Sequence, residues 1–377
     1  MLIDRVAFTG LRNLAALDFS PSPGINLIVG DNGSGKTSLL EGLFILGMGR
    51  SFRTRQLKHA IAHDAREMTL FFRLCGNPPV PVGVRRERDA GELEVRMAGE
   101  RLVRLAQLIE ALPIQLVNPD AFRLLEGPPA ARREFLDWGV FHVKHEFYAA
   151  WQRAKRALKH RNALLRRDRM DAESLTVWER ELAIWGERVD ALRDEWLANF
   201  IPVFEETLAK LIDLPTLSLH YFRGWDRQRS LQQVLEQGRA SDFQMGFTQT
   251  GPQRADLRIR FDGRPAVEVL SRGQQKLVVS ALKLAQGQLL ERMTGRACLY
   301  LVDDLPAELD VQHRYVFCHL LSSMRCQAFV TSVEFDALAG AWKDEIESSV
   351  FHVKQTASGT GQLVPQAQQK DIIRSRQ

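Results

Sequence analysis

The sequence predicts an α/β fold whose two halves are separated by a helical insertion. A continuous apolar run, Ile25 to Val29, precedes a glycine-rich turn and a helix over about 36–46, which is typical of a strand buried on both faces. Residues 132–209 contain only two glycines and repeat apolar side chains at helical spacing. From Asp256 onward, strands and helices alternate again. We therefore expect one α/β head, interrupted by an all-helical arm.

The composition is that of a globular protein with two or three domains. The chain has 377 residues, of which 45% are hydrophobic and 26% charged. No apolar run approaches the roughly 18 residues that span a bilayer, and the N-terminus lacks the order of a secretory signal. We expect a cytoplasmic protein with no membrane partner. The net charge of +5 is compatible with a nucleic-acid partner but does not require one.

The four cysteines show no CxxC spacing and no dense pairing. They predict buried, reduced thiols with no metal or disulfide role. These cysteines are Cys75, Cys298, Cys318 and Cys326.

Alternating and apolar segments predict the remaining strands of the head. A β-rich subdomain is expected in the first half, and a loose polar tail from Gln355. From Asp256 the expected order is strand, strand, helix, strand, helix, strand, helix, strand. We divide the chain into an N-terminal head half (1–130), the arm (131–215) and a C-terminal head half (216–377). The other predicted strands are Leu2 to Phe8, Leu14 to Phe19, Thr69 to Leu74, Pro81 to Arg86, Leu93 to Met97, Pro113 to Val117 and Leu217 to Phe222.

Coiled-coil spacing within the arm predicts two antiparallel helices. They are joined by a turn at about 169–174. Residues 151–170 are rich in Lys and Arg, whereas residues 171–199 are rich in Asp and Glu. One interpretation is that the basic helix pairs with the acidic helix, and the other is that it follows DNA phosphates. The predicted seam residues are Trp151, Ala154, Leu158 and Leu165 on the first helix and Trp178, Leu182, Trp185, Val189, Leu192 and Trp196 on the second.

Residues 30–37, GDNGSGKT, fit the GxxxxGK[ST] pattern of a phosphate-binding loop. The pattern follows a buried strand and opens a helix, which is the structural context in which it binds phosphate. Glycines let backbone amides surround phosphate oxygens, Lys36 reaches the β- and γ-phosphates, and the Thr37 hydroxyl is a Mg²⁺ ligand. The predicted ATP-binding residues here are Gly30, Asp31, Asn32, Gly33, Ser34, Gly35, Lys36 and Thr37.

Two carboxylates follow the apolar strand 298–302. We assign Asp303 to Mg²⁺ and Asp304 to the attacking water, which makes Asp304 the predicted catalytic base beside Lys36. An Asp-Asp pair after a strand can also be a simple turn, but a phosphate-binding loop in the same chain favours the catalytic interpretation.

The segment Leu270 to Gln275, LSRGQQ, admits two interpretations. Ser271 can cap a helix that runs to about Leu290. Alternatively, a serine hydroxyl, a glycine amide and a helix dipole can form a second phosphate-sensing surface. The residues of this surface are Ser271, Arg272, Gly273 and Gln274.

The order of GDNGSGKT, LSRGQQ and LYLVDD resembles the Walker A, signature and Walker B segments of ABC-type ATPases, and residues 306–310 resemble the following D-loop. A head interrupted by a coiled-coil arm is similar to SMC-like proteins. The short arm and further stretches, covering about residues 1–335, resemble the RecF family. These stretches are GRSFR at 49–53, QLVNP at 115–119, FLDW at 135–138 and GPQRADL at 251–257.

The resemblance implies an ATP-dependent homodimer in which Lys36 of one copy and Ser271 of the other grip the same ATP. It places Gln115 near the metal and the water. It also implies RecR and RecO as partners, and duplex DNA or ss/dsDNA junctions as targets, without base specificity. Asp304 replaces the usual Glu, and Thr331 or Ser332 occupies the place of the switch histidine. Both departures favour slow hydrolysis.

Three alternatives remain open at this point. The chain could be a structural DNA clamp with negligible turnover or a transporter ATPase subunit. Arg50, Arg53 and Arg55 could be solvated surface charges or part of a DNA-binding stripe.

Overall fold

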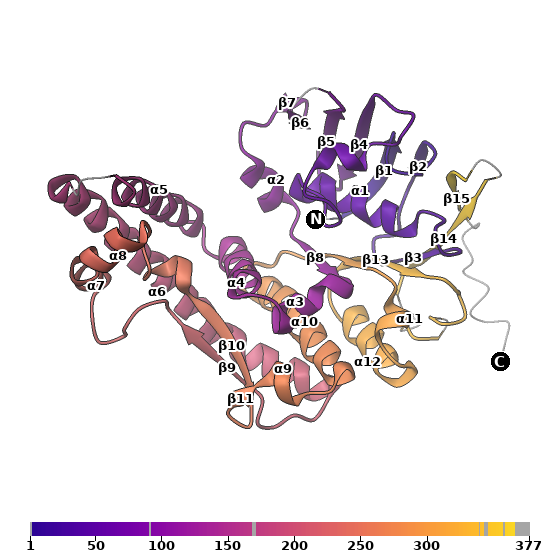
Figure 1. Cartoon of the computed structure of the whole chain (residues 1–377). Coiled ribbons are helices and arrows are strands. Elements are labelled where there is room, and N and C mark those ends of the chain that lie inside the picture. Colours follow the sequence, from indigo (N-terminus) through magenta and orange to yellow (C-terminus); the bar gives the residue numbers. More distant parts are fainter. Residues whose placement is uncertain are drawn as a thin grey trace. The chain divides into compact units, whose positions relative to one another are not determined.

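The computed structural model describes residues 2–89, 92–167, 171–338, 340–342, 346–356 and 359–365 (Figure 1). The chain forms two compact units, Met1–Ala121 with Leu290–Gln377, and Phe122–Leu289. Each unit contains its own sheet structure and its own buried side chains. The division into a head and an inserted arm at 130/131 and 215/216 stays a prediction.

The first unit contains an antiparallel sheet in the order β2-β1-β4-β5-β6-β7. Its strands confirm the predicted β-rich segments to within a few residues. Along β4, alternate residues are buried, so one face of this sheet packs against the interior. The strands are β1 (Ile3–Thr9), β2 (Leu17–Phe19), β4 (Glu67–Leu74), β5 (Val80–Glu87), β6 (Leu93–Met97) and β7 (Glu100–Arg101).

The second sheet of this unit is parallel except for its last strand and has the order β15-β14-β3-β13-β12-β8. Every residue of β3, β12 and β13 is buried, as expected for strands covered on both faces. The carboxyl ends of these three strands meet at one edge, where ligands bind in sheets of this kind. The strands are β3 (Ile25–Val29), β8 (Ile114–Val117), β12 (Leu299–Val302), β13 (Gln327–Ser332), β14 (Ser348–Gln355) and β15 (Gly361–Pro365).

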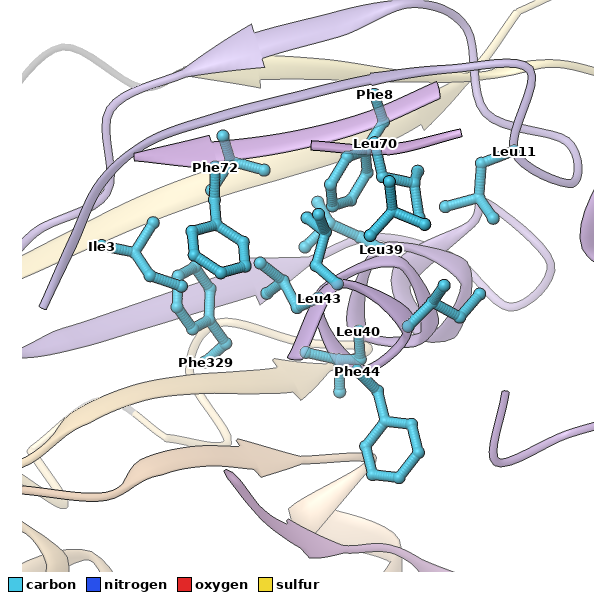
Figure 2. Close-up of a cluster of buried hydrophobic side chains, with 14 of the residues drawn as sticks. Ile3, Phe8, Leu11, Leu39, Leu40, Leu43, Phe44, Leu70, Phe72 and Phe329 are labelled. Carbon is cyan, nitrogen blue, oxygen red and sulfur yellow. The ribbon is translucent and has the colours of Figure 1, made fainter. Parts of the chain in front are cut away.

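Helix α1 (Lys36–Met48) packs between the two sheets. Figure 2 shows Leu39 and Leu43 of this helix among Phe72 of the antiparallel sheet and Phe329 of the parallel sheet. Gly42 allows a close approach, because a Cβ at this position would lie 2.4 Å from the Phe8 ring. The apolar character of α1 on all sides is therefore explained by burial on all sides.

The last part of the chain differs from two expectations. In the described residues between 333 and 347 no helix forms, although a helix was expected before the last predicted strand. The tail from Gln355 was expected to be loose, but Gly361–Pro365 pairs with β14 as strand β15. Pairing with β14 and packing of Leu363 against the core order this short segment, although the tail around it is polar. The tail beyond Pro365 lies outside the described residues. The short helices of this unit are α2 (Leu105–Ala111), α11 (Leu305–Glu308), α12 (Val311–Ser322) and a 3₁₀ turn at Leu57–Ala60.

The second unit combines a three-stranded antiparallel sheet with helices. The sheet has the order β11-β10-β9, and helix α10 runs through the boundary into the first unit. The strands are β9 (Ser218–Phe222), β10 (Asp256–Phe261) and β11 (Arg264–Pro265). The helices are α3 (Arg123–Glu126), α4 (Pro129–Val143), α5 (Phe147–Leu165), α6 (Ala172–Leu211), α7 (Leu231–Gln237), α8 (Arg239–Met245), α9 (Ala266–Val269) and α10 (Arg272–Thr294), with 3₁₀ turns at Pro119–Phe122 and Pro252–Arg254.

Helices α5 and α6 lie side by side and confirm the predicted helix pair (Figure 1). Of the predicted seam, Ala154, Leu165, Leu182, Val189, Leu192 and Trp196 are buried, whereas Trp151, Leu158, Trp178 and Trp185 are half-buried. The predicted turn begins in residues outside the described part of the chain. Asp171 caps α6 by accepting a hydrogen bond from the Ser174 amide.

Three of the cysteines are buried as predicted, but Cys75 is exposed, which corrects that expectation. Cys75 directly follows β4, where the chain leaves the sheet. In the described part of the chain, no helix combines the length and apolarity needed to span a membrane.

Candidate nucleotide-binding site

A cavity of about 570 Å³ opens in the first unit around the GDNGSGKT loop. It combines this loop with the ends of β12 and β13 and with two segments that are distant in the sequence. The lining residues are Arg12, Asn13, Asn32, Gly33, Gly35, Lys36, Thr37, Ser38, Arg53, Ile61, His63, Asp303, Asp304 and Thr331.

The loop between β3 and α1 depends on glycine at two positions. Gly35 has φ 113° and is the N-cap of α1, and a Cβ there would lie 2.6 Å from Leu14 Cδ2. A Cβ on Gly30 would lie 2.2 Å from the Val353 carbonyl oxygen. The backbone can therefore make this tight turn only without side chains at these positions.

The Lys36 side chain folds back over the loop. Its Nζ donates hydrogen bonds to the Gly30 carbonyl at 2.6 Å and to the Asp31 carbonyl at 3.0 Å. Burial lowers the pKa of Lys36, while the carboxylates of Asp304, Asp303 and Asp31 act in the opposite direction. The ammonium group is thus held inside the loop, where a phosphate would meet it.

Asp303 lies at the end of β12 and joins three elements of the site. Its Oδ1 accepts hydrogen bonds from Thr37 Oγ1 at 3.0 Å and from Thr331 Oγ1 at 2.9 Å. Burial raises the pKa of Asp303, whereas the hydrogen bonds from Thr331 and Thr37 lower it. The structure therefore brings together Lys36, Thr37 and Asp303 as the sequence predicted.

Asp304 adopts a left-handed backbone conformation, with φ 51° and ψ 49°. Its amide donates a hydrogen bond of 2.7 Å to Thr331 Oγ1. Such a conformation is strained for a residue other than glycine and is maintained by the surrounding structure. The Thr331 hydroxyl therefore contacts both residues: it donates to the side chain of Asp303 and accepts from the backbone amide of Asp304.

The two hydroxyls at the place of a switch histidine have other partners. Thr331 is buried and donates its proton to Asp303, while Ser332 Oγ donates to the Glu334 carbonyl at 2.6 Å. The structure therefore assigns Thr331 to holding the carboxylates. The expectation that Thr331 or Ser332 stands in for the switch histidine stays a prediction.

Gln115 is not among the residues that line the cavity, and its predicted position near the metal and the water stays a prediction. It is buried within β8, in register with Tyr300 and so three residues before Asp303 along the neighbouring strand.

The signature segment belongs to the second unit and forms the predicted helix cap. Ser271 Oγ accepts a hydrogen bond from the Gln274 amide at 3.3 Å, and Gln274 Oε1 accepts one from the Ser271 amide at 2.9 Å. Arg272 forms an ion pair with Glu126. The Ser271 hydroxyl proton is not used by this cap, and a Cβ on Gly273 would meet no atom within 4 Å. The segment therefore presents an open, exposed surface with a donor available.

Comparison with known proteins places the chain in a family. The family described as RecF/RecN/SMC N terminal domain matches residues 2–359. The chain is 68% identical to the DNA replication and repair protein RecF of Chromohalobacter salexigens, over 94% of this chain and 98% of that protein.

The chain belongs to the RecF family.

A second RecF, from Pseudomonas aeruginosa, is 49% identical over 94% of this chain and 96% of its own length. Among solved structures, a RecF–ATP structure in the RecFOR pathway matches with a TM-score of 0.83 at 22% identity, covering 97% of this chain and 98% of that one. An Smc head bound to a winged-helix domain of ScpA matches with a TM-score of 0.62 at 16% identity, over 98% and 99% of the two chains. These likenesses confirm the ABC/SMC-type fold. Membership of the RecF family excludes the alternative that the chain is a transporter ATPase subunit.

The sequence reasoning missed several residues of this RecF-family cavity. Arg12 and Asn13 come from the loop after β1, and Asn13 Nδ2 donates to the Gly33 carbonyl at 2.9 Å. Arg53, considered only as a solvated or DNA-binding residue, also lines the cavity. The fully buried Glu41 of α1 anchors Arg12 at 2.7 Å and Arg53 at 3.4 Å. The one available signal in the sequence was Glu41, which stands among apolar residues in the helix after the loop. A carboxylate that is buried in this way needs a cation nearby.

The residues present fit a nucleoside triphosphate with Mg²⁺. Helix α1 has no side-chain cap and no acid in its first turn, so its first amides are not covered by the protein's own side chains. Within the described residues, Ser34 Oγ is buried without a hydrogen-bond partner. Thr37 and Asp303 offer the hard oxygen ligands that Mg²⁺ prefers. No group of three or more His, Cys, Asp or Glu side chains gathers in the described ranges, so the remaining Mg²⁺ ligands would have to come from phosphate and water.

Proposed function

We propose that this RecF-family chain is an ATP-dependent DNA-binding repair protein. ATP joins two copies around duplex DNA at gaps or ss/dsDNA junctions, and slow hydrolysis separates the copies and releases the DNA. The observation that carries the proposal is the convergence of Lys36, Thr37 and Asp303 on one cavity at the carboxyl edge of the parallel sheet. The repair role rests on the RecF relatives, and RecO and RecR are the proposed partners for loading recombinase.

The predicted site residues of the cavity each have a defined task in this proposal. The loop amides and Lys36 bind the β- and γ-phosphates, and Thr37 and Asp303 hold the metal ion. Mg²⁺ neutralises charge on the triphosphate when bound. Asp304 orients the attacking water and accepts its proton. Aspartate reaches less far than glutamate, which supports slow turnover.

The second copy completes the site in this proposal. The Ser271 hydroxyl, the Gly273 amide and the Arg272 and Gln274 side chains contact the triphosphate held by the other copy. The free donor and open surface of this segment support the assignment. Both copies then contact the same phosphates, so hydrolysis weakens the contact between them.

Two substitutions test the proposal and separate it from a clamp with negligible turnover. Lys36→Met removes the cation of the loop and is expected to abolish ATP-dependent DNA binding, measured as fluorescence anisotropy of a labelled duplex. Asp304→Asn is expected to keep ATP-dependent DNA binding but to lose hydrolysis by about 100-fold or more, as for loss of a general base. A Lys36→Met protein that kept full ATP dependence would contradict the site. A wild-type protein without measurable Mg²⁺-dependent turnover would favour the clamp.

A further inference from the structure

The outer face of α5, together with its C-cap residue Arg166, carries four exposed cations in one stripe. We call Lys155, Arg156, Lys159 and Arg166 the basic stripe. At about 100° per residue, these positions fall opposite the buried face of the helix, which includes Ala154. Helix α5 contains no Asp or Glu, so no acid on the helix itself offsets this charge.

The acids of α6 do not neutralise the basic stripe. Of the α5 cations, only the fully buried Arg161 pairs with α6, through Glu179 at 3.0 Å. Four other acids of α6 have partners elsewhere: Glu187 accepts from the Leu231 amide, Asp190 from Tyr221 and Arg223, Glu195 from Lys144 and Glu206 from Lys210. Among the described residues, no carboxylate lies within ion-pair distance of the basic stripe. Pairing between a basic and an acidic helix therefore explains Arg161 but not the basic stripe.

Three surface arginines of the antiparallel sheet in the first unit have acidic partners instead. On the antiparallel sheet Arg85 pairs with Glu67 and Glu87, Arg96 with Glu94, and Arg101 with Glu92. There the surface charge is balanced locally, whereas the basic stripe concentrates one sign of charge along a rigid helix. An unbalanced row of cations is the electrostatic feature that a polyanion recognises.

We propose that the basic stripe binds the phosphate backbone of duplex DNA. Residues 155–166 extend over about 16 Å of helix, and duplex DNA carries roughly nine phosphate charges over that length. Lys155 Nζ lies 4.6 Å from the Trp151 ring, which restrains this side chain on the helix surface. Lys and Arg contacts to phosphate carry no base information, so binding here is independent of sequence. The inference rests on the proposed function and adds the surface that performs its DNA contact.

The test is a triple variant of the full chain, Lys155→Gln, Arg156→Gln and Lys159→Gln. A labelled duplex of random sequence is titrated with protein by anisotropy, in ATP and Mg²⁺, over a series of salt concentrations. The slope of log K against log salt is negative. Losing three phosphate contacts makes it less steep by about 2.7, at about 0.9 per contact. At low salt, Kd is expected to rise at least about tenfold.

The matched control removes the same net charge from the balanced sheet, by Arg85→Gln, Arg96→Gln and Arg101→Gln. We expect the Kd and salt slope of the control to stay close to those of wild type. An unchanged slope in the stripe variant, or equal losses in both variants, would overturn the inference. Wild-type protein that bound no DNA in any nucleotide state would instead overturn the proposed function. Circular dichroism and ATP binding, unchanged in both variants, show that the substitutions leave the fold intact.

Discussion

Thr331 is the residue on which the geometry of the two adjacent carboxylates depends. Its hydroxyl donates to Asp303 at 2.9 Å and accepts from the Asp304 amide at 2.7 Å, where the backbone is left-handed. A single buried hydroxyl thus positions the side chain of Asp303, which is assigned to the metal. The same hydroxyl positions the backbone of Asp304, whose carboxylate is assigned to the water. Loss of buried hydrogen bonds of this kind costs about 1–3 kcal/mol.

We expect Thr331→Val to lower ATP hydrolysis by about tenfold or more, because both hydrogen bonds are lost while the side-chain volume is kept. Mg²⁺-dependent ADP binding, measured by calorimetry, should weaken in parallel. Thr331→Ser keeps the hydroxyl and should restore both. Ser332→Ala is the control, since Ser332 donates only to the Glu334 carbonyl. Equal effects of Thr331→Val and Ser332→Ala on both measurements would refute this role.

The cysteines give a second prediction for individual residues. Burial raises the pKa of Cys326 to about 12 and that of Cys298 and Cys318 further, so their reactive thiolate forms are suppressed at pH 8. Cys75 is exposed. We expect a thiol reagent to label one cysteine in the folded protein and four after denaturation, with Cys75→Ser abolishing the first reaction. Rapid labelling of folded Cys75→Ser protein would contradict the buried positions of the other three.

Residues within one local motif could be predicted, whereas residues brought in by tertiary structure could not. The GDNGSGKT loop and Asp303 follow their strands directly, so pattern and context place them together. Arg12 reaches the cavity from another part of the chain, and nothing in its local sequence marks it. Gln115 was placed by resemblance alone, and its role near the metal and the water stays a prediction.

At the scale of elements, the contact between α5 and α6 is organised around a buried ion cluster. The fully buried Arg161 contacts Glu179 at 3.0 Å, Asp242 of α8 at 2.6 Å and Thr248 at 2.8 Å. The cluster joins both arm helices to the segment after α8. Removing Arg161 takes the cation away from the buried Asp242 and leaves Glu179 with its second pair to Arg239, which costs more than the pairs themselves contribute.

We expect Arg161→Met to destabilise the second unit by about 3–5 kcal/mol. Arg188→Met removes an exposed ion pair with Glu146 and should leave the unfolding midpoint almost unchanged, because solvent screens such a pair. Urea unfolding followed by far-UV circular dichroism measures the difference as a shift in midpoint. Superimposable unfolding curves for the two variants would show that the buried cluster does not stabilise the arm.

Elements whose apolar residues recur at a clear spacing could be predicted. Elements that depend on partners from another segment of the chain could not. The apolar run of β3 and the helical spacing of α6 fix their type. Arg161 interrupts the predicted seam because its charge is compensated by α8, which the local pattern does not contain. Strand β15 is short and lies in a polar tail, and it is ordered by its pairing with β14.

At the scale of the whole molecule, the ABC/SMC-type fold could be predicted because three motifs occur in a fixed order. The phosphate loop and the carboxylates lie in the first unit, while the signature segment lies in the second. Sharing one triphosphate between two copies is the central claim of the account. A single sequence cannot supply the partners, because complementary surfaces have no fixed local pattern.

Sedimentation of two complementary variants tests that claim most directly. Lys36→Met and Ser271→Arg are each expected to stay monomeric with ATP, because neither forms an intact shared site with itself. Mixed together, they retain one intact pairing of Lys36 and Ser271 between copies, so a species of twice the monomer mass should appear with ATP and not with ADP. If the mixture stays monomeric while the wild-type protein dimerises with ATP, or if wild type itself stays monomeric with ATP bound, the two copies do not share the nucleotide in this way.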